Sequence, residues 1–274
     1  MQKNKLTLVL GATGKTGRRV AERLTKQGIP VRIGSRSAEP RFDWDDRSTW
    51  QAALDGVASV YVSFYPDLAF PGASETIQSF VGQAVKSGVH RLVLLSGRGE
   101  EGAMAGEQAV QNSGVEWTIV RSSWFNQNFS EGHFLESILA GEVAFPVDNV
   151  AEPFIDVDDI ADMAVAALTE DKHAGQLYEV TGPRLLTFAD AVAEIAKASG
   201  RTISYVPVTP EQYAAGLAEH GVPADFAEPL LDLITTVLDG RNSHLSDGVR
   251  RALGREPKDF SVYARETAAT GVWS

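Results

Sequence analysis

The chain has 274 residues, of which 43% are hydrophobic, and its formal net charge is −11. That length suffices for one full core with a smaller lobe beside it, whereas the negative charge makes nucleic acid a poor partner for the surface as a whole. The chain has no cysteine, which excludes disulfides, thiolate catalysis and cysteine-ligated zinc.

Strand-like and helix-like segments alternate through the first 120 residues. The apolar run 6–10 ends at Gly11 and is too short for a signal core or a membrane span, so we expect a buried strand in a cytoplasmic protein without membrane contact. Further strands are expected at 31–34, 42–44 (very short), 57–64, 91–95 and 117–120, and helices at 15–27, 47–54, 74–86 and 102–112. This order predicts an α/β fold with a doubly wound parallel sheet, covered by helices on both faces.

The pattern loosens after residue 122. Short strands are expected at 143–145, 154–155, 177–180 and 203–208, and helices at 158–168, 187–198, 210–219 and 223–238. We interpret residues 1–122, with parts of 150–182, as the main domain. Residues 123–274 are then a smaller substrate lobe over the sheet.

Ligands on parallel sheets bind beyond the carboxyl ends of the strands. The candidate cofactor residues at these ends are Gly11, Ser35, Arg36, Ser63, Phe64, Ser96, Gly97, Ser122 and Ser123.

The segment GATGKTG at 11–17 is a G-x-x-G-x-x-G pattern between a strand and a helix. Gly11 allows the tight turn, Gly14 lets the backbone approach a pyrophosphate, and Gly17 lets the helix pack on the strand. Additional donors are Thr13, Lys15 and Thr16. The spacing does not match a P-loop, and the remaining alternative is a glycine-rich turn without a ligand. The pattern therefore predicts a nicotinamide dinucleotide.

The end of the second strand discriminates between the two dinucleotides. An acidic residue there would accept from the ribose 2′-hydroxyl, but the segment reads Ser35-Arg36-Ser37. An arginine can pair with a 2′-phosphate, which favours NADP(H) over NAD(H); alternatively, Arg36 is a solvated loop residue. Asp43 and Trp44 follow, and Trp44 either stacks on the adenine or packs in the core.

Several further segments accompany this loop: Ser113-Gly114, WTIVR at 117–121, WFNQN at 124–128, FIDVDDIA at 154–161, YEVTGP at 178–183 and YVPV at 205–208. Together they resemble the NmrA-like group of atypical short-chain dehydrogenases/reductases over nearly the whole chain. The resemblance implies a Rossmann-type sheet with a smaller C-terminal substrate lobe. The group includes NADPH-dependent quinone reductases, a triphenylmethane dye reductase and redox-sensing regulators.

The Tyr-x-x-x-Lys pair of the wider superfamily is missing. None of the six tyrosines has a lysine four residues later, and Ser96 matches the usual serine position but stands alone. Without a proton donor, ketone or alcohol chemistry is disfavoured, whereas a quinone, an iminium or a cationic dye takes hydride unaided.

The substrate pocket is expected to contain Tyr65, Arg98, Trp124, Phe125 and Asn128. The aromatic members suit a planar acceptor, or else they form the joint between two lobes. Tyr65 and His133 are the candidate catalytic residues, with His133 as a proton donor or, alternatively, as an exposed or capping residue.

Two acidic features each have two interpretations. Glu107 matches a recurrent acid of the family, and it either positions a loop or contacts substrate. Asp156, Asp158 and Asp159 either bind a metal or, as we favour, cap and charge the start of the following helix, so no metal is predicted.

Three functions follow from these features. The first is an NADPH-dependent reductase that passes hydride to a quinone or similar planar electrophile, acting as a monomer or a homodimer on a small molecule. The second is a redox sensor that binds NADP(H) without turnover. The third is an isomerase or cyclase of biosynthetic metabolism.

Overall fold

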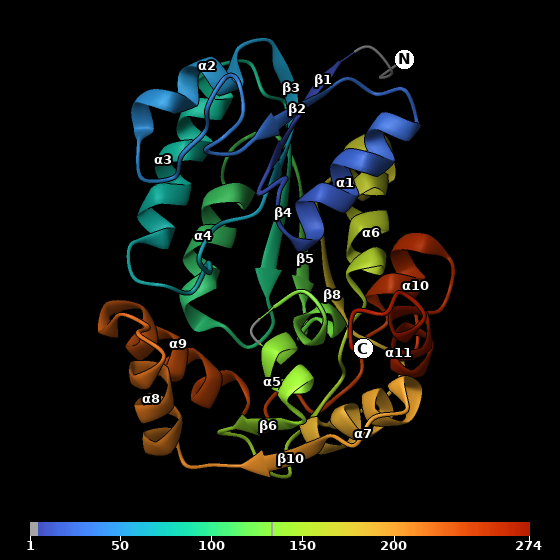
Figure 1. Cartoon of the computed structure of the whole chain (residues 1–274). Coiled ribbons are helices and arrows are strands. Elements are labelled where there is room, and N and C mark those ends of the chain that lie inside the picture. Colours follow the sequence, from blue (N-terminus) through green and yellow to red (C-terminus); the bar gives the residue numbers. More distant parts are fainter. Residues whose placement is uncertain (1–4, 133) are drawn as a thin grey trace.

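A parallel sheet of six strands forms the centre of the molecule (Figure 1). The computed structural model describes residues 5–132 and 134–274. The strands stand in the order β2-β1-β3-β4-β5-β8, and every neighbouring pair is parallel. Their bounds are β1 Leu6–Leu10, β2 Val31–Gly34, β3 Val57–Val62, β4 Arg91–Gly97, β5 Glu116–Ser122 and β8 Gln176–Val180. The predicted α/β class is confirmed, and the carboxyl ends of all six strands lie at one edge.

Helices cover both faces of this sheet (Figure 1). One face carries α1 (Lys15–Lys26) and α6 (Val157–Thr169), and the other carries α2 (Trp50–Leu54), α3 (Ala73–Lys86) and α4 (Glu101–Gln111). Side chains alternate between the two cores, as β4 shows: Leu92 and Leu94 pack on the α3–α4 side, and Val93 packs on the α1–α6 side. Burial on both faces explains why apolar residues dominate β1, β3 and β4.

The very short strand expected at 42–44 is wrong. Phe42 and Trp44 pack edge-on at 4.9 Å between ring centroids, within an aromatic cluster that also contains Trp50. The indole Nε1 of Trp50 donates to the Asp43 carbonyl over 2.7 Å. The backbone carbonyl here therefore accepts from a side chain and not from a neighbouring strand. A 3-10 helix, η1 (Arg47–Thr49), then leads into α2.

The second lobe has its own small sheets and its own core. Its strands form a parallel pair, β6 (Glu142–Phe145) with β10 (Ser204–Pro207), and an antiparallel pair, β7 (Ala151–Glu152) with β9 (Leu186–Thr187). The helices are η2 Asn126–Phe129, α5 Phe134–Ala140, η3 Asp171–His173, α7 Phe188–Ser199, α8 Pro210–Glu219, α9 Ala224–Val237, α10 Gly248–Leu253 and α11 Phe260–Ala268. Of these, η3 and α10 lie with the central sheet, because η3 contacts α6 and α10 packs against β8 and α6.

The lobe core is mainly aromatic. Phe129, Phe134, Phe145, Phe188 and Phe260 are all buried in one cluster. Stacked and edge-on ring pairs join them, for example Phe134 and Phe145 with centroids 4.9 Å apart. Such pairs bury large areas at low conformational cost and hold the lobe as one body.

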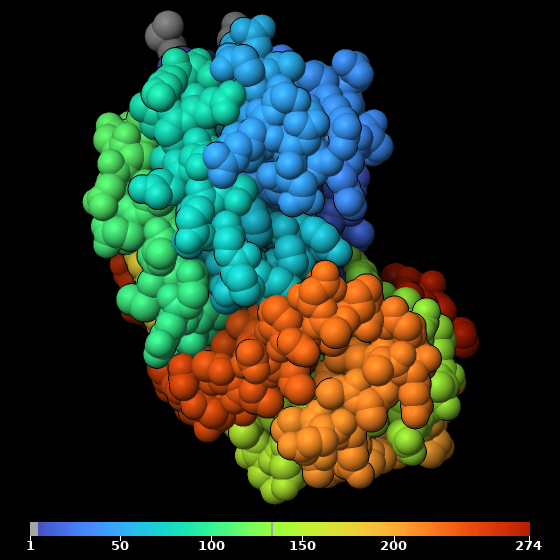
Figure 2. Space-filling model, turned by 90° about the vertical axis from the view of Figure 1, so that its left-hand side faces the viewer, coloured from blue at the N-terminus to red at the C-terminus, as the bar shows by residue number. Residues whose placement is uncertain are grey.

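The α8–α9 hairpin reaches back to the central domain. Figure 2 shows this hairpin, in orange, lying against the surface that α3 and its preceding loop form. The rings of Phe226 in α9 and Phe70 after β3 lie 5.7 Å apart. The start of α8 has a capping box, in which Thr209 and Gln212 bond each other's backbone. Within the described residues, no helix has the length and apolarity of a bilayer span.

Candidate functional site

The loop after β1 has the geometry that its glycine pattern predicts. Gly11 adopts a φ of 63°, and the N–H of Gly14 donates to the Gly11 carbonyl over 2.8 Å, which closes the turn. A Cβ on Gly17 would overlap the Gly11 carbonyl oxygen and lie 2.6 Å from its carbon. Only glycine therefore allows α1 to pack this closely on the turn.

Helix α1 starts with N–H groups that no side chain caps. Gly14 is its N-cap residue, and the first turn contains no acidic side chain. Free N–H groups and the positive end of the helix dipole favour a phosphate at this position. The hydroxyl of Thr13 is on an exposed residue, whereas Thr16 is buried. The crowded turn and the uncapped helix fit a dinucleotide pyrophosphate, which residues 11–16 would hold.

Lys15 extends from α1 towards the segment that follows β5. Its Nζ lies 3.0 Å from the position that a Cβ on Gly132 would take. Burial lowers the pKa of the Lys15 ammonium, and the carboxylate of Glu131 opposes that shift. A phosphate beside this ammonium would compensate its desolvation.

The end of β2 presents an unpaired cation. Arg36 is exposed, and it has no carboxylate partner among residues 5–132 and 134–274. Ser35 accepts through its carbonyl from the Phe42 N–H over 2.9 Å, and its hydroxyl lies 3.4 Å from that of Ser37. The guanidinium is therefore free to meet a ligand at this strand end.

Aromatic residues fill the space between the ends of β2 and β3. Trp44 is half-buried, with its ring 4.9 Å from that of Phe64. The Asp43 carboxylate accepts from the Arg41 guanidinium over 2.5 Å and from the Asp45 N–H over 3.2 Å. Trp44 thus packs against the core, and its contact with an adenine stays a prediction.

At the end of β3, Ser63 lies against the glycine-rich loop. Its Cβ is 3.2 Å from the position that a Cβ on Gly11 would take. Tyr65, two residues later, is 67% exposed. It is open to a ligand, and its catalytic role stays a prediction.

A pair of carboxyl groups lies between the ends of β3 and β4. Glu100 covers Gly97 so closely that a Cβ there would overlap its carboxyl group. Glu100 and Asp67 hydrogen-bond to each other, and burial raises the pKa of both carboxyl groups. At least one of them therefore holds a proton more readily than an exposed acid would.

Ser96 and its neighbours are buried at the ends of β4 and β5. The Ser96 hydroxyl donates to Glu107 over 2.6 Å, and Arg121 also donates to that carboxylate. Ser122 donates to the Ser96 carbonyl over 3.3 Å, and Ser123 donates to the Pro153 carbonyl over 2.6 Å. Each of these hydroxyl protons is engaged within the protein.

Arg98 is 2% exposed and binds the C-terminal part of the chain. Its Nη1 donates to the Asn242 carbonyl over 3.3 Å, and its Nη2 lies 2.7 Å from His244 Nε2. Its Nε is 3.6 Å from the Glu179 carboxylate. These contacts direct the guanidinium to the joint between sheet and lobe.

The segment after β5 connects the two bodies. Trp124 packs edge-on against Phe145 and Phe188 of the lobe core, at 5.9 and 5.7 Å between centroids. Phe125 bridges to Ile155 and packs on the α1–α6 side of the sheet. Asn128 is partly exposed. The predicted proton donor, His133, lies outside the described residues.

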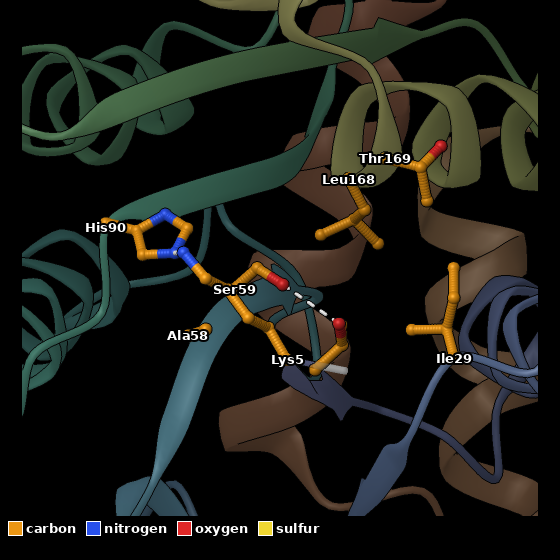
Figure 3. A pocket seen from close by; sticks show the side chains of 8 residues that line it. Lys5, Ile29, Ala58, Ser59, His90, Leu168 and Thr169 are labelled. Carbon is orange, nitrogen blue, oxygen red and sulfur yellow. Dashed lines mark hydrogen bonds between the residues drawn. The ribbon is translucent and has the colours of Figure 1, made fainter. Parts of the chain in front are cut away.

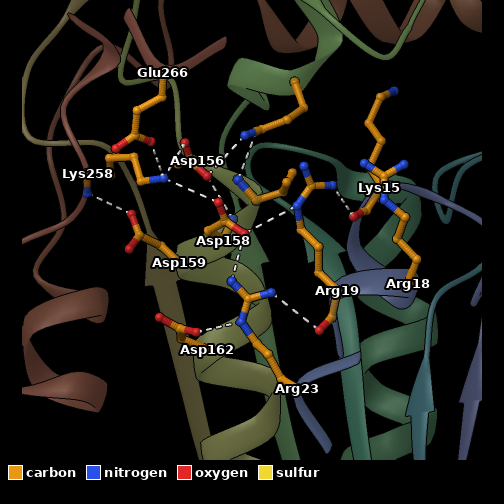
Figure 4. A network of polar contacts seen from close by, with 12 residues as sticks. Lys15, Arg18, Arg19, Arg23, Asp156, Asp158, Asp159, Asp162, Lys258 and Glu266 are labelled. Atoms are coloured by element: carbon orange, nitrogen blue, oxygen red, sulfur yellow. Dashed lines mark hydrogen bonds and ion pairs between the residues drawn. The ribbon is translucent and has the colours of Figure 1, made fainter. Parts of the chain in front are cut away.

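Glu131 joins this segment to α1. Its carboxylate accepts from Arg18 over 2.6 Å and from Arg19 over 2.7 Å. Figure 4 shows the surrounding network, in which Arg19 and Arg23 also reach Asp158 of α6, at 3.2 and 2.7 Å. The segment is thereby held beside the start of α1.

The acidic cluster at the start of α6 is used for capping and ion pairs. Asp156 caps the helix by accepting from the Asp158 N–H over 2.8 Å. Lys258 lies 3.2 Å from Asp158 (Figure 4). Arg255 pairs with Asp159. In the described part of the chain, no group of three or more histidine or acidic residues is placed to hold a metal.

Two cavities lie away from this edge. One of about 20 Å³ is at the amino ends of the strands, where Lys5 and His90 lie 3.0 Å apart and Thr7 bonds Ser59 (Figure 3). It has room for a water molecule and no more. The other, of about 290 Å³, lies between α7, α11 and the chain end at Ser274. Neither belongs to the carboxyl edge, where the loop and helix geometry points to the cofactor.

Three functional candidates at this edge were not predicted from the sequence: Glu131, Asp67 and Glu100. Glu131 bonds residues that precede it by 112 and 113 positions. Glu100 and Asp67 follow different strands, so only the parallel topology brings them together. The positions of acids just after β3 and β4 were the one available signal.

The family model for NAD(P)H-binding proteins matches residues 11–171. The chain is 33% identical to the uncharacterized oxidoreductase YesF of Bacillus subtilis, over 100% of both chains. It is 30% identical to an NAD(P)H azoreductase of Xenophilus azovorans, over 96% of this chain and 98% of that one.

A solved structure shares the whole architecture. The NADPH-dependent quinone oxidoreductase QOR2 of Escherichia coli superposes with a TM-score of 0.74, covering 97% of this chain and 99% of that chain. The two sequences are 21% identical, so the likeness concerns the fold.

Proposed function

The chain belongs to the NAD(P)H-binding family and is an oxidoreductase, and we propose that it uses NADPH to reduce a quinone or a similar planar electrophile. Bound NADPH would supply the hydride. The quinone would take this hydride and one proton and leave as the hydroquinone. The protein would contribute proximity and orientation.

The preference for NADPH rests on the end of β2. Arg36 is exposed there and has no ion-pair partner in the described part of the chain; Ser35 and Ser37 flank it, and the segment 35–37 contains no acid. A guanidinium binds a 2′-phosphate by charge-assisted hydrogen bonds, whereas an acid would repel it. The uncapped start of α1 would hold the pyrophosphate, with Lys15 beside it.

The observation that carries the choice of acceptor is the composition of α4. This helix follows Ser96, where a tyrosine and a lysine would supply the acid of ketone reduction. It carries neither residue and instead directs Glu107 at Ser96. A carboxylate in ion pair with Arg121 has no proton to give to an alkoxide. An acceptor whose reduced form is a weak base needs no such donor.

The acceptor would lie beside the aromatic segment after β5. Tyr65, Trp124 and Phe125 would provide flat apolar surface, and Asn128 would add a polar contact. His133 stays the proposed proton donor for the hydroquinone oxygen. We assign residues 1–122 and parts of 150–182 to the cofactor and residues 123–274 to the acceptor.

The test begins with binding. NADPH, NADP⁺, NADH and NAD⁺ are titrated into the wild-type chain and into Arg36→Ala by calorimetry. We expect NADPH to bind more tightly than NADH, and Arg36→Ala to weaken NADPH by about 1.5–3 kcal/mol with little effect on NADH. Arg250→Ala removes another exposed arginine, on α10, and should leave all four affinities unchanged.

Turnover is then measured with 1,4-naphthoquinone and with an unactivated ketone. Oxidation of NADPH with the quinone and not with the ketone supports the proposal. Tight binding without consumption of NADPH would instead identify a sensor. Equal affinity for NADH and NADPH would overturn the assignment of Arg36.

A further inference from the structure

Ser96 lies at the end of a buried chain of polar contacts. Its hydroxyl approaches Oε1 of Glu107 at 2.6 Å. Arg121 donates from Nε to the same oxygen over 2.9 Å and from Nη2 to Oε2 over 2.5 Å. Arg121 also reaches Glu179 of β8 at 3.2 Å. Ser96 and Glu107 are each 4% exposed, so water takes little part in these contacts.

Glu107 is the acceptor in its contact with Ser96. A guanidinium that donates to both oxygens of one carboxyl group forms its charge-assisted pair with the ionised carboxylate. The hydrogen bond to Glu107 is also the largest cause of the raised pKa of Arg121. An ionised carboxylate carries no proton, so the proton in the 2.6 Å contact comes from Ser96.

Ser96 is therefore left with lone pairs only. A hydroxyl has one proton, and this one is directed at Glu107 on α4. The hydroxyl of Ser122 donates to the Ser96 carbonyl and not to its side chain. Within residues 5–132 and 134–274, the Ser96 oxygen thus has unused acceptor capacity at the carboxyl end of β4.

That capacity lies on the nicotinamide side of the proposed site. The phosphates would bind at α1, after β1, and Arg36 after β2 marks the adenosine end. A dinucleotide held by these residues would have its nicotinamide on the side of β4 and β5, across β3 from the turn after β1. Ser96 is one of the last residues of β4.

We propose that Ser96, oriented by Glu107 and Arg121, acts towards bound ligands as a hydrogen-bond acceptor for an N–H group and not as a donor to a carbonyl. This inference rests on the proposed function. Two ligands can present the N–H group: the carboxamide of the nicotinamide, or an acceptor substrate that carries an amino group. In this role Ser96 orients a ligand but does not polarise a ketone.

The test compares two dinucleotides that differ in this group. NADPH carries a carboxamide, whereas the reduced 3-acetylpyridine analogue carries a methyl ketone and has no N–H there. We expect Ser96→Ala to weaken NADPH by about 5- to 10-fold, the loss of one neutral hydrogen bond, and to leave the analogue unchanged. Ser59→Ala removes a buried hydroxyl that bonds Thr7 at the amino ends of the strands, and should change neither affinity.

The ratio of the two affinities within one variant is the decisive quantity, because partial unfolding would lower both alike. If the ratio is unchanged, KM is compared for 2-amino-1,4-naphthoquinone and 1,4-naphthoquinone. A rise in KM for the amino compound alone identifies the acceptor as the source of the N–H group.

The inference is overturned if Ser96→Ala alters neither ratio, or if it weakens the analogue more than NADPH. Both of these results leave the proposed function standing. A wild-type chain that binds neither dinucleotide overturns the proposed function and this inference with it.

Discussion

Glu131 accepts a 2.7 Å hydrogen bond from Arg19, across 112 residues of sequence. This contact ties the segment after β5 to the helix that begins at the glycine-rich loop. The exposed fractions of the two side chains are 15% for Arg19 and 21% for Glu131, so solvent screens the pair only in part.

Replacing Glu131 by Gln should loosen this segment locally. The change removes the charge from hydrogen bonds to Arg18 and Arg19, and a half-buried ion pair of this kind is worth about 1–2 kcal/mol. Amide exchange in residues 126–132 should therefore accelerate by about 5- to 30-fold, measured by hydrogen exchange with mass spectrometry. Glu256→Gln, which breaks an exposed pair with Arg250, is the control and should change exchange very little. Unaltered exchange in 126–132 would show that the pair does not hold the segment.

Gly17 and Gly82 form a matched pair of helical glycines. A Cβ on Gly17 would strike the backbone of Gly11, which cannot move aside without breaking the turn. Gly17→Ala should therefore cost about 1–3 kcal/mol of stability and abolish dinucleotide binding. A Cβ on Gly82 in α3 meets nothing within 4 Å, so Gly82→Ala should stabilise by up to about 1 kcal/mol. Urea unfolding and NADPH titration measure both effects, and a tolerated Gly17→Ala would contradict the packing argument.

The sequence predicted the central sheet because its signals are local. Strands β1, β3 and β4 are largely apolar segments of the sequence, and the glycines of the first turn follow β1 directly. The strand expected at 42–44 failed for a tertiary reason. Its β-forming residues Phe42 and Trp44 pack with Trp50 and Phe80, which come from later elements.

The sequence identified individual site residues, but it did not predict the contacts between residues that are far apart in the chain. Ser96 and Glu107 were both identified, but the direction of their hydrogen bond depends on Arg121 in the adjacent strand. Helix α11 was missed although Asp259 caps it by accepting from the Ser261 N–H, a start signal that the sequence contains. The contacts of Glu131 have no local signature at all.

Phe226→Ala should free the α8–α9 hairpin from the central domain. Both rings of the Phe70–Phe226 contact are only half-buried, so the global stability should fall by less than about 1 kcal/mol. Amide exchange in residues 210–226 should increase. If the acceptor lies between lobe and sheet, KM for 1,4-naphthoquinone should rise while the affinity for NADPH is kept. Phe70→Ala should reproduce these effects, and a difference between the two variants would argue against the ring contact as their cause.

Glu152 should make the protein less stable as the pH rises towards neutrality. Its side chain is fully buried in β7, and neither carboxylate oxygen has a hydrogen-bond partner in the described residues. Burial raises its pKa to about 7, with Arg98 opposing the shift and Asp239 adding to it. An unfolded chain releases this proton near its ordinary pKa of 4.5, so between pH 4.5 and 7 the folded state binds more protons than the unfolded state.

The free energy of unfolding should therefore fall across that window, by on the order of 3 kcal/mol, and then level off above pH 7. Glu152→Gln keeps the shape of the side chain and removes the titration. We expect the free energy of unfolding, measured with urea at pH 5 and pH 8, to change by this amount less in Glu152→Gln than in the wild type. Asp67 and Glu100 titrate in the same direction in both proteins, so their contribution cancels in this comparison. Glu142→Gln, at an exposed position of β6, should retain the wild-type difference. If Glu152→Gln also retained it, the carboxyl group would have to be hydrated or paired at neutral pH, because only a solvated or compensated carboxylate ionises without a cost in stability.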